Sequence, residues 1–161
     1  MLIEMTVAAV TLDPLTNMPI IILRSDTGKK TLPIWIGLLE ATAIATEIEK
    51  IKVARPMTHD LLKSILSDLE VKIEKIVVTD LRENTYYAII YLIDREGKIH
   101  EIDSRPSDAI ALSLRVGCKL FIDEDVIEKS HSAEYSNKSE VDKWTEYLEN
   151  LSPEAFGKYK M

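Results

Sequence analysis

The spacing of hydrophobic residues changes period several times along this chain of 161 residues. Short aliphatic runs between turn residues predict strands, and apolar residues at every third or fourth position predict helices. We expect strands at residues 3–12, 19–23, 30–36, 71–81, 86–93, 98–102 and 119–122, and helices at 38–50, 58–69, 107–114 and 123–129. Helices scattered among hairpin-connected strands favour an α+β fold. We expect a mixed, mostly antiparallel sheet with helices packed on it, plus a short C-terminal helical tail.

The second predicted helix has a clear apolar stripe. Thr58 is its expected N-cap, and Asp60 lies in the first turn, where the helix dipole favours a carboxylate. The stripe consists of Leu61, Leu62, Ile65, Leu66 and Leu69. Because such a stripe normally faces the core, we expect it to be buried.

The length of the chain fits one domain with an appendage. We place the domain at residues 1–130, a polar connector at 131–138 and an amphipathic helical tail at 139–161. In the tail Val141, Trp144, Leu148 and Leu151 recur at helical spacing, so the tail is expected to dock on its own domain or on a neighbouring subunit. We therefore expect a homo-oligomer.

Cysteine content and hydropathy indicate the cellular compartment in which we expect the protein. The single cysteine, Cys118, cannot form an intramolecular disulfide, and secreted domains of this size usually carry paired cysteines. No apolar run reaches the length of about 18 residues that a membrane span needs. We expect a cytoplasmic protein with no membrane partner.

The net charge of −7 argues against nucleic acid as a partner. Dedicated nucleic-acid binders usually carry an excess of basic residues, because contacts with phosphates supply much of their affinity. DNA or RNA could bind only through a local basic surface or through bound cations.

Three polar clusters are the candidate sites. The first is Glu40 and Glu47, seven residues apart on the first predicted helix, which places both carboxylates on one side. They either face a shared polar pocket or pair with Lys50, Arg55 or solvent.

The second cluster is the segment RPMTHD at residues 55–60. Helix capping explains Thr58 and Asp60 but not Arg55 or His59. A histidine titrates near neutral pH, so His59 could act as a base or a metal ligand, or simply be exposed in the first helical turn.

The third cluster is the segment DSRPSD at residues 103–108, which leads into an apolar helix. Asp103, Arg105, Ser107 and Asp108 could form a site. They could equally form a capping network in which Arg105 bridges Asp103 and Asp108.

Together these segments resemble a known family. LPIWIG at residues 32–37 with Glu40, RPMTHDL at 55–61 and IDSRPSDAIAL at 102–112 are similar to the bifunctional nuclease family, formerly a domain of unknown function, over roughly residues 1–130. The resemblance implies an α+β domain, commonly oligomeric, and for some members cleavage of both DNA and RNA. It does not imply that every member is a nuclease.

The resulting hypothesis is a nuclease that hydrolyses phosphodiester bonds in DNA or RNA. His59, Asp60, Asp103 and Asp108 are its candidate catalytic residues, and Arg55, Arg105 and Ser107 are its candidate substrate-binding residues. Clustered carboxylates commonly hold Mg²⁺ or Mn²⁺ in such enzymes, so Glu40, Glu47, Asp60 and Asp103 are candidate metal ligands. No organic cofactor is expected. A non-catalytic assembly or regulatory module, and a binder of small anions, stay open as alternatives.

Overall fold

One sheet organises the molecule. The computed structural model describes residues 1–135, and within them seven strands form a single sheet in the order β3-β2-β1-β7-β4-β5-β6. The strands are β1 (Leu2–Leu12), β2 (Pro19–Ser25), β3 (Thr31–Trp35), β4 (Lys72–Arg82), β5 (Thr85–Ile93), β6 (Ile99–Ser104) and β7 (Lys119–Asp123). Five of the neighbouring pairs are antiparallel, and only β4 and β7 run parallel. The expected mixed, mostly antiparallel sheet is confirmed.

The three N-terminal strands, each of them predicted, form an antiparallel meander. Asp13 makes the β1–β2 turn, where its Oδ1 accepts a bond from the backbone N–H of Leu15 at 2.8 Å. The indole N–H of Trp35 donates to Asp13 Oδ2 at 2.9 Å and ties β3 to this turn. Strand β7 then joins the meander to the β4–β5–β6 hairpins by pairing with both β1 and β4.

Two helices supply most of the helical part of the core. Helix α1 (Leu38–Ile48) packs on α3 (Pro106–Val116), and α3 packs on β4 and β5. The packed side chains are aliphatic and include Met5, Ile21, Leu23, Ile44, Ile76, Val78, Ile90, Ile110 and Ile122. Helix α3 ends at Gly117, whose φ of 74° lies in the left-handed region that favours glycine at the end of a helix.

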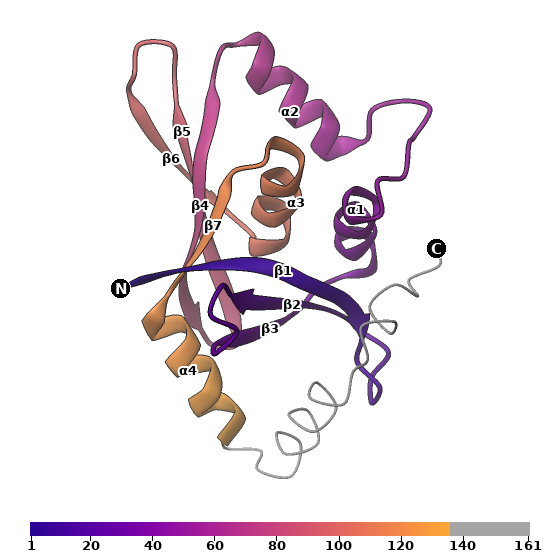
Figure 1. Ribbon diagram of the computed structural model, residues 1–161, viewed down its shortest axis with the longest axis vertical. Helices are drawn as coiled ribbons and strands as arrows, with labels where there is room; N and C mark the ends of the chain where they lie inside the picture. The colour runs from indigo at the N-terminus through magenta and orange to yellow at the C-terminus, as the bar shows by residue number, and fades with distance from the viewer. Residues whose placement is uncertain (136–161) are drawn as a thin grey trace.

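Helix α2 (Thr58–Asp68) differs from its prediction. It packs on α3, but none of the residues 58–68 is buried. Leu61, Leu62, Ile65 and Leu69 are exposed, so the prediction that this stripe is buried is wrong. Figure 1 shows α2 at the upper edge of the molecule, on the same side of β4, β5 and β6 as α1 and α3. His59 and Lys63 of α2 instead bond to α3, and Leu66 is the one apolar residue of the stripe that is partly buried. The N-cap is Met57 rather than Thr58.

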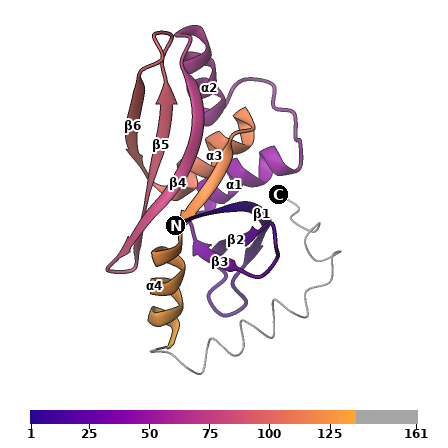
Figure 2. The same cartoon turned by 60° about the vertical axis from the view of Figure 1, so that its left-hand side comes forward.

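The last described helix is longer than expected. Helix α4 (Glu124–Tyr135) buries Val126 and Ile127 against the sheet and continues past the expected end at Lys129 into the predicted connector. Figure 2 shows α4 below the ends of β4 and β7, apart from the other three helices. The predicted tail at 139–161 lies outside the described residues.

Candidate functional site

Three helix N-termini bring together residues from the three polar clusters. Glu40 lies in the first turn of α1, His59 in the first turn of α2, and Asp108 in the first turn of α3, with Arg105 as the N-cap residue of α3. Arg105 donates from Nη1 to Glu40 Oε1 at 2.7 Å and from Nε to Asp108 Oδ2 at 3.1 Å. The other oxygen of Asp108, Oδ1, lies 3.0 Å from His59 Nε2. We call these four residues the His59 cluster.

Electrostatics stabilises the charged forms in this cluster. The backbone N–H of Glu40 itself and the guanidinium of Arg105 hold the pKa of the Glu40 carboxyl below its usual value. Glu40, followed by Asp108, raises the pKa of Arg105 further. Arg105 therefore stays cationic and Glu40 anionic at any pH near neutrality.

Gly37 makes room for the Glu40 carboxylate. It is the N-cap residue of α1, and a Cβ atom placed on it would collide with Glu40 Oε2. Its φ of −75° is open to any residue, so the need for glycine here is one of space. A side chain at this position would push Glu40 away from Arg105.

A second network of hydrogen bonds is centred on Arg115. Arg115, in the last turn of α3, is buried and donates from Nε to Asp60 Oδ1 at 2.8 Å. Its Nη1 and Nη2 donate to the carbonyls of Ala111 and Ala43 at 2.9 and 3.0 Å. Asp60 Oδ2 accepts the N–H of Met57 at 3.0 Å, and this bond, followed by Arg115, lowers the pKa of Asp60. One arginine thus fastens α2 and α1 to α3.

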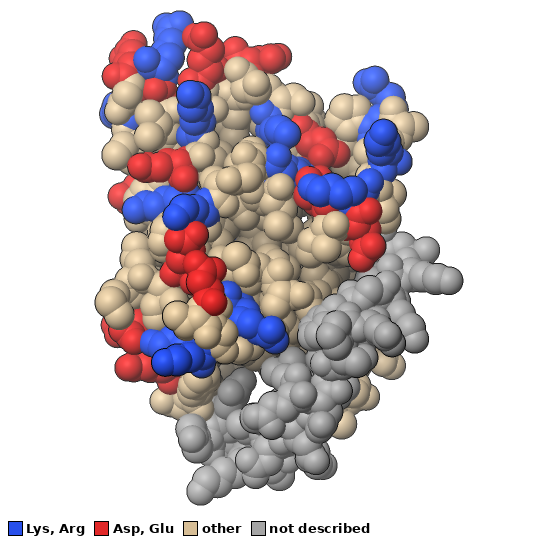
Figure 3. Space-filling view, viewed as in Figure 1, with Lys and Arg blue, Asp and Glu red and all other residues tan. Residues whose placement is uncertain are grey.

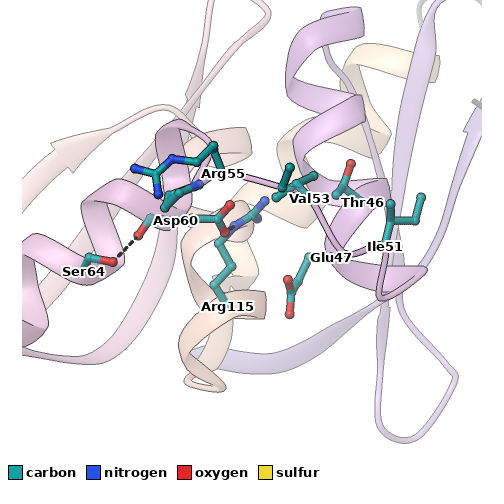
Figure 4. Close-up of a pocket in the computed structure, with 10 residues that line it drawn as sticks. Thr46, Glu47, Ile51, Val53, Arg55, Asp60, Ser64 and Arg115 are labelled. Carbon is teal, nitrogen blue, oxygen red and sulfur yellow. Dashed lines mark hydrogen bonds and ion pairs between the residues drawn. The ribbon is translucent and has the colours of Figure 1, made fainter.

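A pocket of about 330 Å³ opens beside this second network. Glu47, Arg55, Asp60 and Arg115 line it together with Thr46 and Ser64. In Figure 4 Asp60 lies between Arg55, from the loop before α2, and the guanidinium of Arg115, while Glu47 comes from α1. Glu47 accepts a bond from Lys50 at 3.0 Å, which is the pairing that its helical position allowed.

Asp103 does not join these groups. It pairs across the strands with Ile89 of β5, whereas the neighbouring Ala88 and Ile90 belong to the core. Because side chains alternate between the faces of a sheet, Asp103 lies on the face away from the helices. This corrects the expectation that it acts with Asp60 and Asp108. Ser107 lies in the first turn of α3 and is buried.

Comparison with known proteins agrees with this arrangement. A family model described as the bifunctional nuclease domain matches residues 21–134. The chain belongs to the bifunctional nuclease domain family. Two proteins from Mycobacterium tuberculosis, from strains CDC 1551 / Oshkosh and ATCC 25618 / H37Rv, are each 33% identical to it over 163 residues. The alignment covers 95% of this chain and 97% of each relative, and both relatives are described as uncharacterised.

The carboxylates of this bifunctional nuclease domain do not form a ready metal cage. Among residues 1–135, no three His, Cys, Asp or Glu side chains are grouped as metal ligands. Glu40 and Asp108 bind Arg105, and Asp60 binds Arg115, so their oxygens face arginines.

Sequence reasoning missed Arg115 and Gly37. Arg115 could have been noticed as a long charged residue within the apolar repeat of α3, but its partners come from two other helices. Gly37 appears in the sequence only as the last residue of the segment LPIWIG, which does not reveal the space that Glu40 needs. In the described part of the chain, no helix is both long and apolar enough to cross a membrane.

Proposed function

We propose that this protein hydrolyses phosphodiester bonds of nucleic acid at the His59 cluster. The observation that supports the proposal most is the contact between His59 and Asp108, two residues 49 positions apart in the sequence, next to an exposed arginine. Membership of the bifunctional nuclease domain family points to the same activity.

His59 is the proposed general base. The Asp108 carboxylate can only accept, so His59 Nε2 carries the proton and Nδ1 is left basic. Nδ1 takes a proton from a water molecule as its oxygen attacks the phosphorus, the bond to the leaving oxygen breaks, and that oxygen takes a proton from solvent. Asp108 orients the imidazole and stabilises its protonated form, as carboxylates beside catalytic histidines do.

Arg105 is the proposed contact for the phosphate. Its bonds to Glu40 and Asp108 use two of its N–H groups, and a guanidinium has about five. The remaining donors can bind two phosphate oxygens while Glu40 and Asp108 fix the plane of the side chain. Arg55, exposed at the rim of the pocket, is the proposed contact for a neighbouring phosphate.

The activity can be tested with the purified full chain on single-stranded DNA, duplex DNA and RNA. Arg105→Ala should lower kcat/KM by at least about tenfold, as loss of a charge-assisted bond to phosphate does. Arg82→Ala is the matched control, because Arg82 is 61% exposed, against 65% for Arg105, and also pairs with an aspartate, Asp80. Equal rates for both variants would contradict the role of Arg105.

Dependence on a metal stays a prediction from the sequence. If Mg²⁺ or Mn²⁺ takes part, excess EDTA should abolish cleavage and the added ion should restore it. Cleavage that is unchanged in EDTA would leave Arg105 as the group that neutralises the phosphate. Because each phosphate bound by an arginine releases counterions, binding should weaken with added salt in either case.

A non-catalytic module is the second candidate function. The same ion pairs that form the proposed site also tie α1, α2 and α3 together, which gives them a structural role without catalysis. A purified chain that binds but never cleaves the three substrates, with or without added metal, would favour the module. We place either function in the cytoplasm, which fractionation of cells can test.

A further inference from the structure

The pocket of about 330 Å³ has two charged groups with unused bonding capacity. Within residues 1–135, Arg55 has no hydrogen-bond or ion-pair partner. Glu47 accepts a bond from Lys50 through Oε1 at 3.0 Å, and in the same part of the chain its Oε2 accepts none. Arg55 and Glu47 do not bond to each other, and in Figure 4 the pair of Asp60 and Arg115 lies between them. The pocket therefore offers a cation at one place and a carboxylate at another.

Apolar residues complete the lining of this pocket. They come from the loop between α1 and α2 and are all exposed: Ile51, Val53, Ala54 and Pro56. Apolar walls with a few polar groups are usual in small-molecule sites, and the volume lies at the lower end of their range of about 300–1,000 Å³. A fitting ligand is compact and has an anionic group for Arg55, an apolar surface for the walls and N–H donors for Glu47.

We propose that the pocket binds a guanine nucleotide, with its base at Glu47 and its phosphate at Arg55. A nucleotide combines the three features, because it carries a phosphate, two flat ring faces and a polar base edge. The inference rests on the proposed function for its link to nucleic acid, but the match to the pocket depends only on the lining residues.

The carboxylate of Glu47 selects guanine among the bases. An ionised carboxylate can only accept hydrogen bonds, and its two oxygens have about four lone pairs, of which Lys50 uses one. Guanine presents N1–H and the N2 amino group side by side, so one donor meets each oxygen. Adenine and cytosine place an acceptor nitrogen beside their amino group, and uracil and thymine place carbonyl oxygens on both sides of N3–H. These acceptors repel the carboxylate, which disfavours the other bases.

The loop that carries Arg55 gathers positive charge for the phosphates. Lys50, Lys52 and Arg55 all lie in it and are exposed. Figure 3 shows basic side chains at the right, over the loop between α1 and α2. Such a local concentration of charge attracts phosphates even though the whole chain has a net charge of −7.

The position of the pocket relative to the His59 cluster defines the substrate further. Helix α1 carries Glu40 of the cluster and Glu47 of the pocket, and seven residues of a helix span about 10 Å. One strand of nucleic acid advances about 3.4 Å per stacked nucleotide, so about three nucleotides cover this distance. Glu47 binds the edge of guanine that base pairing would occupy, so the guanine has to be unpaired. The substrate is thus single-stranded nucleic acid, cut within about three nucleotides of a guanine.

Binding of mononucleotides tests the pocket without any cleavage. In NMR titrations of the full chain, GMP should bind about 10- to 100-fold more tightly than AMP, CMP or UMP, the discrimination expected of a bidentate contact. Glu47→Gln should remove this preference, because one oxygen is replaced by an amino group. Glu49→Gln is the matched control, since Glu49 is exposed at the end of the same helix, does not line the pocket and should leave the preference unchanged. Equal affinities in the wild type, no GMP binding at millimolar concentration, or a preference that survives Glu47→Gln overturns the proposal.

The place of the phosphate is tested separately. Arg55→Gln should weaken GMP binding by at least about tenfold and leave the binding of guanosine, which has no phosphate, unchanged. Lys52→Gln is the matched control in the same loop, because Lys52 is exposed and does not line the pocket. Equal losses for GMP and guanosine in Arg55→Gln overturn the assigned direction of the nucleotide.

Cleavage of single-stranded oligothymidylate with one internal guanine separates the pocket from the proposed function. Cuts should fall within about three nucleotides of the guanine, and replacing it by adenine should lower the rate by at least about tenfold. His59→Ala should lose the cleavage and keep the preference for GMP. Cuts at positions unrelated to the guanine overturn the inference and leave the proposed cleavage in place. Selective GMP binding by a chain that cuts no substrate supports the pocket and contradicts the proposed function.

Discussion

The molecule contains two histidine–aspartate pairs that look alike in isolation. His59 Nε2 lies 3.0 Å from Asp108, and His100 Nε2 lies 2.7 Å from Asp94. The first pair joins α2 to α3, and the second lies within the β5–β6 hairpin, six positions apart in the sequence. The His59 side chain is 12% exposed and that of His100 is 40% exposed.

The surroundings of the two aspartates separate the pairs. Asp94 Oδ1 accepts the backbone N–H groups of Glu96 and Lys98, so its second oxygen meets His100 as part of a hairpin turn. Asp108 instead shares Arg105 with Glu40 of another helix. A short distance between histidine and carboxylate is thus common to a turn and to a candidate site. Arg105, a nearby cation with unused N–H donors, is what gives the His59–Asp108 pair a possible chemistry.

The largest expected difference between the pairs is in catalysis. His59→Ala should lower kcat on nucleic acid by about 10²- to 10⁴-fold, the range for loss of a general base. His100→Ala should leave kcat unchanged, because no candidate substrate-binding residue of the described chain contacts it. Both rates are measured on the same substrates with equal protein concentrations.

The control for this experiment is folding. Circular dichroism should show both variants folded. Comparable loss in both variants would mean that the two pairs are equivalent and would remove the basis for choosing His59.

The second expected difference is in stability. Arg115 supports α2, and with it the first pair, but has no contact with the β5–β6 hairpin. Its side chain is 3% exposed and makes three hydrogen bonds. Arg115→Met should lower the free energy of unfolding by about 2–4 kcal/mol, since it leaves Asp60 and two carbonyls without their donor. Urea unfolding measures this cost.

Arg95→Met is a suitable comparison, because Arg95 is exposed in the turn next to the second pair. Its cost should stay within about 0.5 kcal/mol, as for most surface substitutions. A cost for Arg115→Met as small as this would show that the second network is not needed to hold α2.

Most of the fold could be predicted from hydrophobic spacing. The seven strands and four helices lie close to their expected positions, because local periodicity and turn residues determine them. The orientation of α2 could not be predicted, because the bonds of His59 and Lys63 to α3 join residues about 50 positions apart in the sequence. The end of α4 was missed because polar residues 130–135 carry no clear stop signal.

The sequence predicted which residues form the site better than it predicted which of them lie together. Glu40, His59, Arg105 and Asp108 were all named from the sequence, and the structure brings them into contact. Asp103 was grouped with them by its position in the chain, but strand alternation turns it to the other face. Partners of Arg115 come from segments 55 and 72 positions away, and no local pattern reveals them.

The third expected difference concerns acid stability at Asp60, which lies next to His59. Its pKa is lowered by the N–H of Met57 and by Arg115, so its contribution is complete above the pKa of the unfolded chain and is lost as pH falls through the folded pKa. Asp60→Asn should be less stable than the wild type at pH 7 and pH 5. The gap should narrow below about pH 3.8, the ordinary value of this group, as the wild-type carboxyl becomes neutral. Urea midpoints across this range measure the gap, and a gap that is constant with pH would contradict the assigned cause.

The smallest expected effect belongs to the second pair. The bonds from His100 and from the N–H of Lys98 lower the pKa of Asp94, which gives the same direction of pH dependence as for Asp60. Asp94 lies in a hairpin turn at the surface, however, and solvent-screened pairs of this kind contribute little to stability. Asp94→Asn keeps an oxygen for the turn N–H groups and loses only the charge beside His100. We expect its urea midpoint to match that of the wild type at pH 7 and at pH 3 within the error of the measurement. A pH-dependent loss as large as that of Asp60→Asn would make the hairpin pair as structurally important as the α2 network, and the contrast between the two pairs would then rest on catalysis alone.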